Sequence, residues 1–287
     1  MRDHSSETPH LATLAFTAAA MLAFAANSLL CRLALAGGGI DPASFGAIRI
    51  ASGALALVII VRVRAGSGAA GGDWLSASML FAYVALFSFA YVGLSAGTGA
   101  LILFGAVQLT MFGWAMRGGE RFTPLAWCGL ALAAGGLVCL VLPGVSAPPL
   151  AGAASMALAG AAWGVYSLRG RGAPDPLGAT AGNFLRAAPL ALVSWLPFID
   201  GAHADASGIV LAVASGALTS GVGYALWYTA LRGLTAMRAA TVQLSVPLIT
   251  AVGAVAFLAE PVTWRLVLAS AAILGGIALV LARRPKQ

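Results

Sequence analysis

Tyrosine and tryptophan side chains recur at helical spacing inside the apolar stretches of this 287-residue chain. The candidate binding residues of this kind are Tyr83, Tyr91, Trp163, Tyr166, Tyr224, Trp227 and Tyr228. Positions 83 and 91 share one helical stripe, as do positions 224, 227 and 228. Buried Tyr and Trp need a partner for their O–H or N–H, which a wet cavity supplies. As a set they predict a broad, mostly neutral cavity for flat or aromatic solutes, including cations held by cation–π contact. For any single residue, helix–helix packing is an equally good interpretation.

Uncharged polar residues in the same stretches could orient a bound solute. They are Asn27, Ser28, Gln108, Ser167 and Gln243. Each could instead form a hydrogen bond between neighbouring helices. We favour Asn27 with Ser28, and Gln243, as binding residues.

Two arginines lie well inside apolar stretches, at equivalent places in the two halves of the chain. Arg49 and Arg186 are each about 10 Å from a helix end, given a rise of ~1.5 Å per residue. One of them could meet a substrate carboxylate, because buried ionisable groups usually line a cavity or form pairs. We favour the alternative for both, snorkelling or capping of backbone carbonyls, because their symmetry suits a shared structural role.

The residue types argue against catalysis, a metal site and ATP hydrolysis. The single lysine, Lys286, lies in the C-terminal tail, so there is no Walker A loop. The three histidines are near the N-terminus or in a loop, so none can serve a buried Ser or Cys nucleophile. No His, Cys, Asp or Glu cluster has metal-ligand spacing. We expect no enzyme activity and no cofactor.

The elements that must position these side chains are membrane-spanning helices. Hydrophobic residues make up 60% of the chain, charged residues 9%, and the mean hydropathy is +0.94. A soluble domain carries about 25% charged residues, whereas a bilayer needs runs of about 20 apolar residues that satisfy their own backbone hydrogen bonds. The sequence predicts an all-α membrane protein with ten such helices, at roughly 11–33, 43–61, 75–95, 98–116, 125–142, 151–168, 177–198, 207–230, 235–258 and 264–282.

The charged residues between the runs predict the orientation. Cations gather in alternate loops, at Arg2, Arg62, Arg64, Arg117, Arg121, Arg169, Arg171, Arg232, Arg238, Arg283, Arg284 and Lys286. The opposite loops contain mainly Asp41, Asp200, Asp205, Glu260 and Arg265. This asymmetry predicts that both termini are cytoplasmic in a bacterial inner membrane. The net charge of +7 is spread over these loops, so we expect no nucleic-acid partner.

An internal repeat divides the chain into two five-helix units, 1–146 and 147–287. A shift of 140 residues aligns 83–142 with 223–282 without a gap, at roughly a quarter identity. The alignment pairs Glu120 with Glu260 and Gly135–Gly136 with Gly275–Gly276. An odd number of crossings per unit makes the second unit inverted, a design of secondary carriers with a binding site between the repeats.

Motifs in the second unit resemble a half-unit of the drug/metabolite transporter superfamily, of the EamA type. They are Tyr224-Ala-Leu-Trp-Tyr228, Gln243-Leu-Ser-Val-Pro247, Leu258-Ala-Glu260 and Gly275-Gly276. Nearly the whole chain shares the likeness, which is greatest to the YddG-like exporters of aromatic amino acids and methyl viologen. The resemblance implies ten helices, five plus five inverted, and export of amino acids, metabolites or toxic organic compounds. Val107 occupies the place of Pro247, so a kink in the ninth helix need not occur in the fourth.

These observations predict a secondary transporter that exports small organic solutes by alternating access. We expect the bilayer and a small-molecule substrate as its partners, and a monomer as the working unit. No acidic residue falls inside a run, which favours a facilitator that follows the solute gradient over the alternative of coupling through Glu120 or Glu260. The alternatives are an importer or a passive channel of the same fold, and a membrane receptor or scaffold.

Overall fold

The computed structural model describes residues 7–65, 71–119, 122–142, 144, 147–171, 173–234 and 236–282. This part of the chain is helical and contains no β-strand, apart from an isolated bridge between Ile40 and Ala204. The helices of the first half are α1 (Glu7–Ala36), α2 (Pro42–Ala65), α3 (Trp74–Tyr91), α4 (Ala96–Arg117) and α5 (Pro124–Val141). Those of the second half are α6 (Leu150–Gly170), α7 (Pro176–Trp195), η1 (Leu196–Gly201), α8 (Ala206–Val213), η2 (Ala214–Val222), α9 (Gly223–Leu231), α10 (Ala236–Gln243), α11 (Ser245–Leu258) and α12 (Trp264–Ala282).

Nine helical segments in the described ranges are long and apolar enough to cross a membrane. Ten runs were expected, and the tenth is α6, which falls short of this apolar character. Its 21 residues are rich in Ala and Gly, and it packs between α3 and α4. Because α6 is covered by other helices, it needs small residues for close packing more than it needs an apolar surface for lipid.

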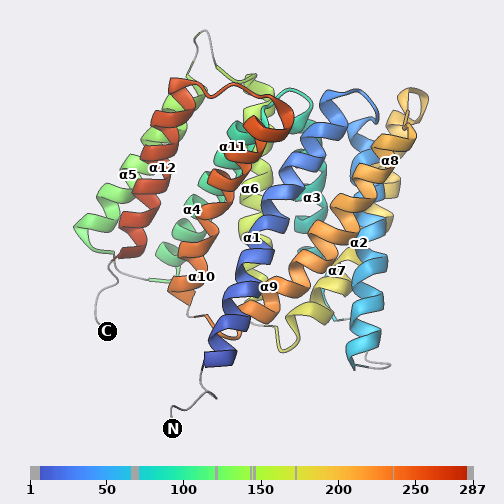
Figure 1. Cartoon of the computed structure of the whole chain (residues 1–287), viewed down its shortest axis with the longest axis horizontal. Helices are drawn as coiled ribbons and strands as arrows, with labels where there is room; N and C mark the ends of the chain where they lie inside the picture. Colours follow the sequence, from blue (N-terminus) through green and yellow to red (C-terminus); the bar gives the residue numbers. More distant parts are fainter. Residues whose placement is uncertain are drawn as a thin grey trace.

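Figure 1 shows a bundle in which helix direction alternates along the chain. α1 begins and α12 ends at the bottom of this view, and we call this end of the bundle the lower end. α5 and α12 form a pair at one side, and α2 packs against α7 at the other. Between these pairs, α6 packs on α3 and α4, while α1 packs on α9 and α11.

Two helices are irregular, and both irregularities lie beside the site described below. The eighth crossing is α-helical at α8 and α9 but forms a π-helix at η2. The ninth crossing breaks at Leu244, between α10 and α11, whereas α4 is continuous. Pro247 accounts for the break, since it has no N–H for the carbonyl of Gln243 and its ring clashes with that carbonyl.

Asp, Ser and Thr side chains begin several helices and fix their ends at the membrane surfaces. Asp73 caps α3, Ser95 caps α4 and Asp205 caps α8, each by accepting from the backbone N–H of the third helical residue. Asp73 also pairs with Arg169 at 3.0 Å and so ties α3 to the end of α6. The hydrogen bond from Ser76, aided by Arg169, holds the pKa of the Asp73 carboxyl below its ordinary value.

Candidate functional site

A cavity of about 610 Å³ enters the bundle from the lower end. The residues that line it deep in the bundle are Gln108, Trp163, Tyr166, Ser167, Tyr224, Trp227, Tyr228 and Gln243. Its mouth lies among Arg64, Arg171, Asp175 and Arg232, at the ends of α2, α6 and α9 and the start of α7. The volume is in the range of sites for small organic molecules, about 300–1,000 Å³.

Three aromatic rings form a stack at the inner end of this cavity. Trp163 lies between Tyr166 and Tyr224, with ring centroids 5.3 Å and 5.4 Å away and interplanar angles of 29° and 20°. Trp163 and Tyr166 lie one turn apart on α6 and Tyr224 lies on α9, so the stack joins these two helices of the second half. The ring of Trp163 also lies beside that of Tyr83 of α3, with the two centroids 4.9 Å apart and the ring planes inclined at 45°.

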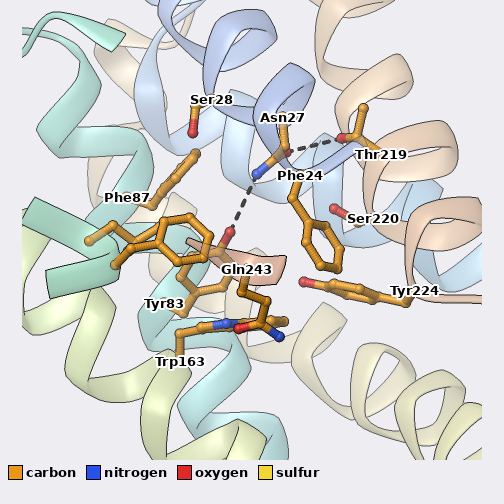
Figure 2. Close-up of a pocket in the computed structure, with 12 residues that line it drawn as sticks. Phe24, Asn27, Ser28, Tyr83, Phe87, Trp163, Thr219, Ser220, Tyr224 and Gln243 are labelled. Atoms are coloured by element: carbon orange, nitrogen blue, oxygen red, sulfur yellow. Dashed lines mark hydrogen bonds between the residues drawn. The ribbon is translucent and has the colours of Figure 1, made fainter. Parts of the chain in front are cut away.

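A second, smaller pocket lies beyond the stack, toward the upper end. It has a volume of about 30 Å³, more than the roughly 10–15 Å³ that one water needs. Trp163, Tyr224 and Gln243 line both spaces and therefore form the partition between them. Figure 2 shows the smaller pocket, with Asn27 and Ser28 of α1 on one side and the ring of Trp163 on the other.

The amide of Asn27 is the centre of a polar cluster in the smaller pocket. Its Oδ1 accepts from Ser215 at 2.7 Å and from Thr219 at 3.2 Å. Its Nδ2 donates to the hydroxyl of Tyr83 at 3.3 Å. Figure 2 shows the bonds to Tyr83 and Thr219, which span from α1 to α3 and to η2. The two hydroxyls fix the amide so that its donor side faces Tyr83.

Arg49 lies directly behind this cluster and is 1% exposed. Its Nη2 donates to the Tyr83 hydroxyl at 3.0 Å and its Nε to Ser220 at 3.4 Å, while Nη1 has no partner. The guanidinium lies 5.1 Å from the ring centroid of Tyr83 and 5.0 Å from that of Phe87. The described residues contain three ion pairs, and Arg49 belongs to none of them. A buried cation with only neutral partners is unusual and costly.

The π-helix supplies the residues that sequence reasoning missed. Ser215, Thr219 and Ser220 all meet Asn27 or Arg49. The carbonyl of Ser215 accepts from both Thr219 and Ser220, four and five residues later. The available signal was three hydroxyl residues within six positions of an otherwise apolar run. π-helical turns are rare and are found frequently at functional sites.

At the upper end, one turn beyond Ser28 on α1, an ion pair joins several helix ends. Arg32 of α1 contacts Glu260 at 3.1 Å and donates to the carbonyls of Tyr91 and Val92. The other oxygen of Glu260 accepts from the backbone N–H of Ala96, at the start of α4, at 2.7 Å. We call Arg32, Glu260 and the N–H of Ala96 the upper-end latch. It connects α1, α3, α4 and the chain after α11.

Besides Arg49, which lies behind the smaller pocket, two residues that sequence analysis singled out line neither space. The ring of Tyr91 packs edge-on against Phe87, and its hydroxyl donates to the carbonyl of Ala96 at the upper end. Arg186 donates to the backbone carbonyls of Gly71 and Gly182, the capping role that we favoured. Arg49 and Arg186 therefore have unlike surroundings despite their equivalent positions.

No group of three or more His, Cys, Asp or Glu side chains in the described ranges is placed to hold a metal ion. The arrangement instead offers stacking surfaces, hydroxyls and one buried positive charge. Glu120, the sequence equivalent of Glu260, lies outside the described residues.

Comparisons with known proteins agree with this architecture. The chain is 53% identical to the uncharacterized protein PA1977 of Pseudomonas aeruginosa, over 96% of each chain. A solved crystal structure of a protein shares the fold, with a TM-score of 0.64 over 92% of this chain and 98% of that one, at 22% identity. Residues 150–282 match the profile of the EamA-like transporter family. With its long apolar helices, the chain is therefore a multi-pass membrane protein whose second half, residues 150–282, belongs to the EamA-like transporter family.

Proposed function

We propose that this protein is a secondary transporter that exports a small organic solute by alternating access. The observation that carries the proposal is the aromatic cavity of about 610 Å³, which reaches the middle of the bundle from one end only. The stack of Trp163 and Tyr224 and the upper-end latch lie between this cavity and the other end. A channel needs a continuous path, whereas a carrier is open to one side at a time.

The helix contacts support an inverted-repeat design. In such a design each helix contact has a counterpart, in which both helices are replaced by their equivalents in the other half. The counterpart of the contact of α3 with α6 is the contact of the eighth crossing with α1, and both contacts occur. The same replacement turns the contact of α4 with α6 into that of α11 with α1, and both occur. The pairs α2 with α7, and α5 with α12, map onto themselves. The site lies at the centre of this pattern, where carriers of this design bind their substrates.

Charge supports the proposed orientation in the membrane. The helices that end at the lower end are α2, α4, α6 and α9. In or directly after their last turns these helices carry the described arginines Arg62, Arg64, Arg117, Arg169, Arg171 and Arg232. By the positive-inside rule this end faces the cytoplasm of an inner membrane, so the cavity opens to the cytoplasm and α1 begins on that side. In the export that we propose, the solute enters the cavity from the cytoplasm and leaves at the opposite face, whereas an importer would release its solute through the same opening.

Counterflow in liposomes tests the transporter proposal. The purified protein is reconstituted, and uptake of labelled phenylalanine or tryptophan against an excess of the same unlabelled solute inside is measured. We expect saturable counterflow in the wild type and a loss of about tenfold or more in Trp163→Ala, because the stacking of a nucleobase on one aromatic side chain contributes about 1–3 kcal/mol and a flat solute stacks in the same way. Trp264→Ala is the matched control, since Trp264 is 80% exposed at the start of α12.

Three outcomes would contradict the proposal. Flux without saturation or counterflow indicates a channel. Equal loss in Trp163→Ala and Trp264→Ala removes the aromatic cavity as the site. Absence of flux for these amino acids and for threonine, nucleoside and viologen controls indicates a receptor or scaffold.

A further inference from the structure

We propose that the smaller pocket binds the anionic head, a carboxylate, of the transported solute, with Arg49 as the source of positive charge. The cargo is then an organic anion with a flat apolar group, which lies against Trp163 and Tyr224 while its carboxylate enters the pocket. This inference rests on the proposed transport function and names its substrate class.

The first support is the uncompensated charge. Arg49 is buried, its Nη1 has no partner, and no carboxylate in the described ranges lies within ion-pair distance. The rings of Tyr83 and Phe87 stabilise a cation only in part. A buried charge is retained where it pairs or serves a site, and here the pair is missing.

The second support is that the cluster offers donors and few acceptors. The Tyr83 hydroxyl accepts from both Arg49 and Asn27, and its own proton has no acceptor among the described residues. The Asn27 carbonyl is occupied by Ser215 and Thr219, and the second N–H of its amide has no acceptor in that part of the chain. Figure 2 shows the hydroxyls of Tyr83 and Tyr224 directed toward the interior of the pocket. A set of free donors beside a cation matches a carboxylate, which only accepts.

The third support is the charge along the entry path. Neither space is lined by an acidic residue except Asp175, which pairs with Arg64 at 3.3 Å. Arg171 and Arg232, also at the mouth, form no ion pair with any described residue. This field attracts anions and repels organic cations. The site therefore disfavours the cations that the aromatic residues alone would accept.

The test uses three ligands with one carbon skeleton and different charges. Binding of 3-phenylpropionate, 3-phenylpropan-1-ol and 3-phenylpropylamine to the purified full-length protein is measured by equilibrium dialysis at neutral pH. We expect the anion to bind about 10- to 100-fold more tightly than the alcohol and the amine, the range given by hydrogen bonds to charged groups. Equal affinities, or tighter binding of the amine, would overturn the inference.

Variants separate recognition of charge from folding. Arg49→Gln should remove the preference for the anion, and Tyr83→Phe should weaken it about tenfold while keeping the ring stack. Arg186→Gln is the matched control, because Arg186 caps backbone carbonyls outside both spaces, and it should keep the preference. If Arg49→Gln does not fold, Tyr83→Phe decides: an unchanged preference for the anion in this variant refutes the role of the cluster.

The result also distinguishes this inference from the transport proposal. Saturable counterflow of aromatic solutes combined with no preference for the anion leaves the transporter standing and rejects the carboxylate site. Absence of both counterflow and binding rejects the two together.

Discussion

At the scale of single residues, two residues at equivalent positions of the sequence repeat can have different partners in the structure. Arg49 and Arg186 occupy corresponding places in the two halves, which suggested one shared structural role. Arg186 reaches the carbonyls of Gly71 and Gly182, whereas Arg49 is enclosed by rings and hydroxyls. The difference comes from the neighbours: η2 presents Ser220 to Arg49, and α3 presents Tyr83. A sequence pattern cannot show this, because the neighbours are far away along the chain.

A substitution of Asn27 by aspartate tests the missing counter-charge. Asn27→Asp keeps an oxygen for Ser215 and Thr219 but places a carboxylate beside the Tyr83 hydroxyl that Arg49 also contacts. This internal anion should occupy the site, so binding of 3-phenylpropionate should fall by about tenfold or more, and binding of 3-phenylpropylamine should rise. Equilibrium dialysis measures both, with 3-phenylpropan-1-ol as the ligand whose binding should not change. Undiminished binding of the anion would argue against this site.

At the scale of helices, much of the fold can be predicted from the sequence. Nine of the ten expected runs correspond to described helical segments that are long and apolar enough to cross a membrane, because lipid allows a spanning segment little except such a helix, and the tenth corresponds to the less apolar α6. The break in the ninth crossing follows from Pro247, and α4, with Val107 there, is continuous. The π-helix could not be predicted, because periodicity analysis assumes 3.6 residues per turn and η2 has hydrogen bonds to the fifth residue.

Most of the aromatic residues chosen from the sequence do line the cavity, since Trp163, Tyr166 and Tyr224 lie on inward stripes of α6 and α9. Tyr91 lies on the stripe of Tyr83 but two turns nearer the upper end, where it packs against Phe87. Of the two tyrosines, only Tyr83 lies at the depth of the site. Helical spacing predicts which face of a helix a residue occupies, but it does not predict how deep in the bundle the residue lies.

The glycines at the contact between α5 and α12 provide a prediction at the scale of helices. An added Cβ at Gly276 would lie 2.6 Å from the backbone N of Ala133, and one at Gly129 would lie 2.5 Å from the carbonyl of Gly276. A Cβ at Gly275 would meet nothing within 4 Å. Gly276→Ala must therefore separate the helices, at a cost of about 1–3 kcal/mol, whereas Gly275→Ala should be neutral or stabilising.

Thermal unfolding of the two variants in detergent measures this difference. We expect a lower midpoint for Gly276→Ala and an unchanged or higher one for Gly275→Ala. Similar midpoints for both would mean that α5 and α12 are not held together by close backbone approach.

At the scale of the whole molecule, the two ends differ in how they are closed. The upper end has the latch, in which Glu260 joins Arg32 and the start of α4. The lower end has the mouth of the cavity, and Arg171 lies there without an ion pair to any described residue. The dipeptide Ser28-Leu29 of the first half matches Ser167-Leu168 of the second half. Arg32 and Arg171 each lie four residues after the serine and are therefore equivalent, and the shift of 140 residues pairs Glu120 with Glu260. An inverted repeat would use this second pair at the lower end once the upper end has opened.

Neutralising the two glutamates should therefore shift the molecule in opposite directions. Glu260→Gln breaks the ion pair of the upper-end latch and should favour the state open at that end. Glu120→Gln should disfavour the same state, because it removes the carboxylate that we expect Arg171 to bind there. A charged pair worth about 1.4 kcal/mol changes the ratio of states tenfold.

A labelling experiment measures this shift. With Cys31, Cys128 and Cys139 replaced, a cysteine at position 28 in place of Ser28 reports on access from the upper end, since Ser28 lines the smaller pocket. Its labelling in cells by an impermeant maleimide should speed up in Glu260→Gln and slow down in Glu120→Gln. Changes of the same sign in both variants would mean that the two glutamates do not hold opposite ends of one alternating cycle.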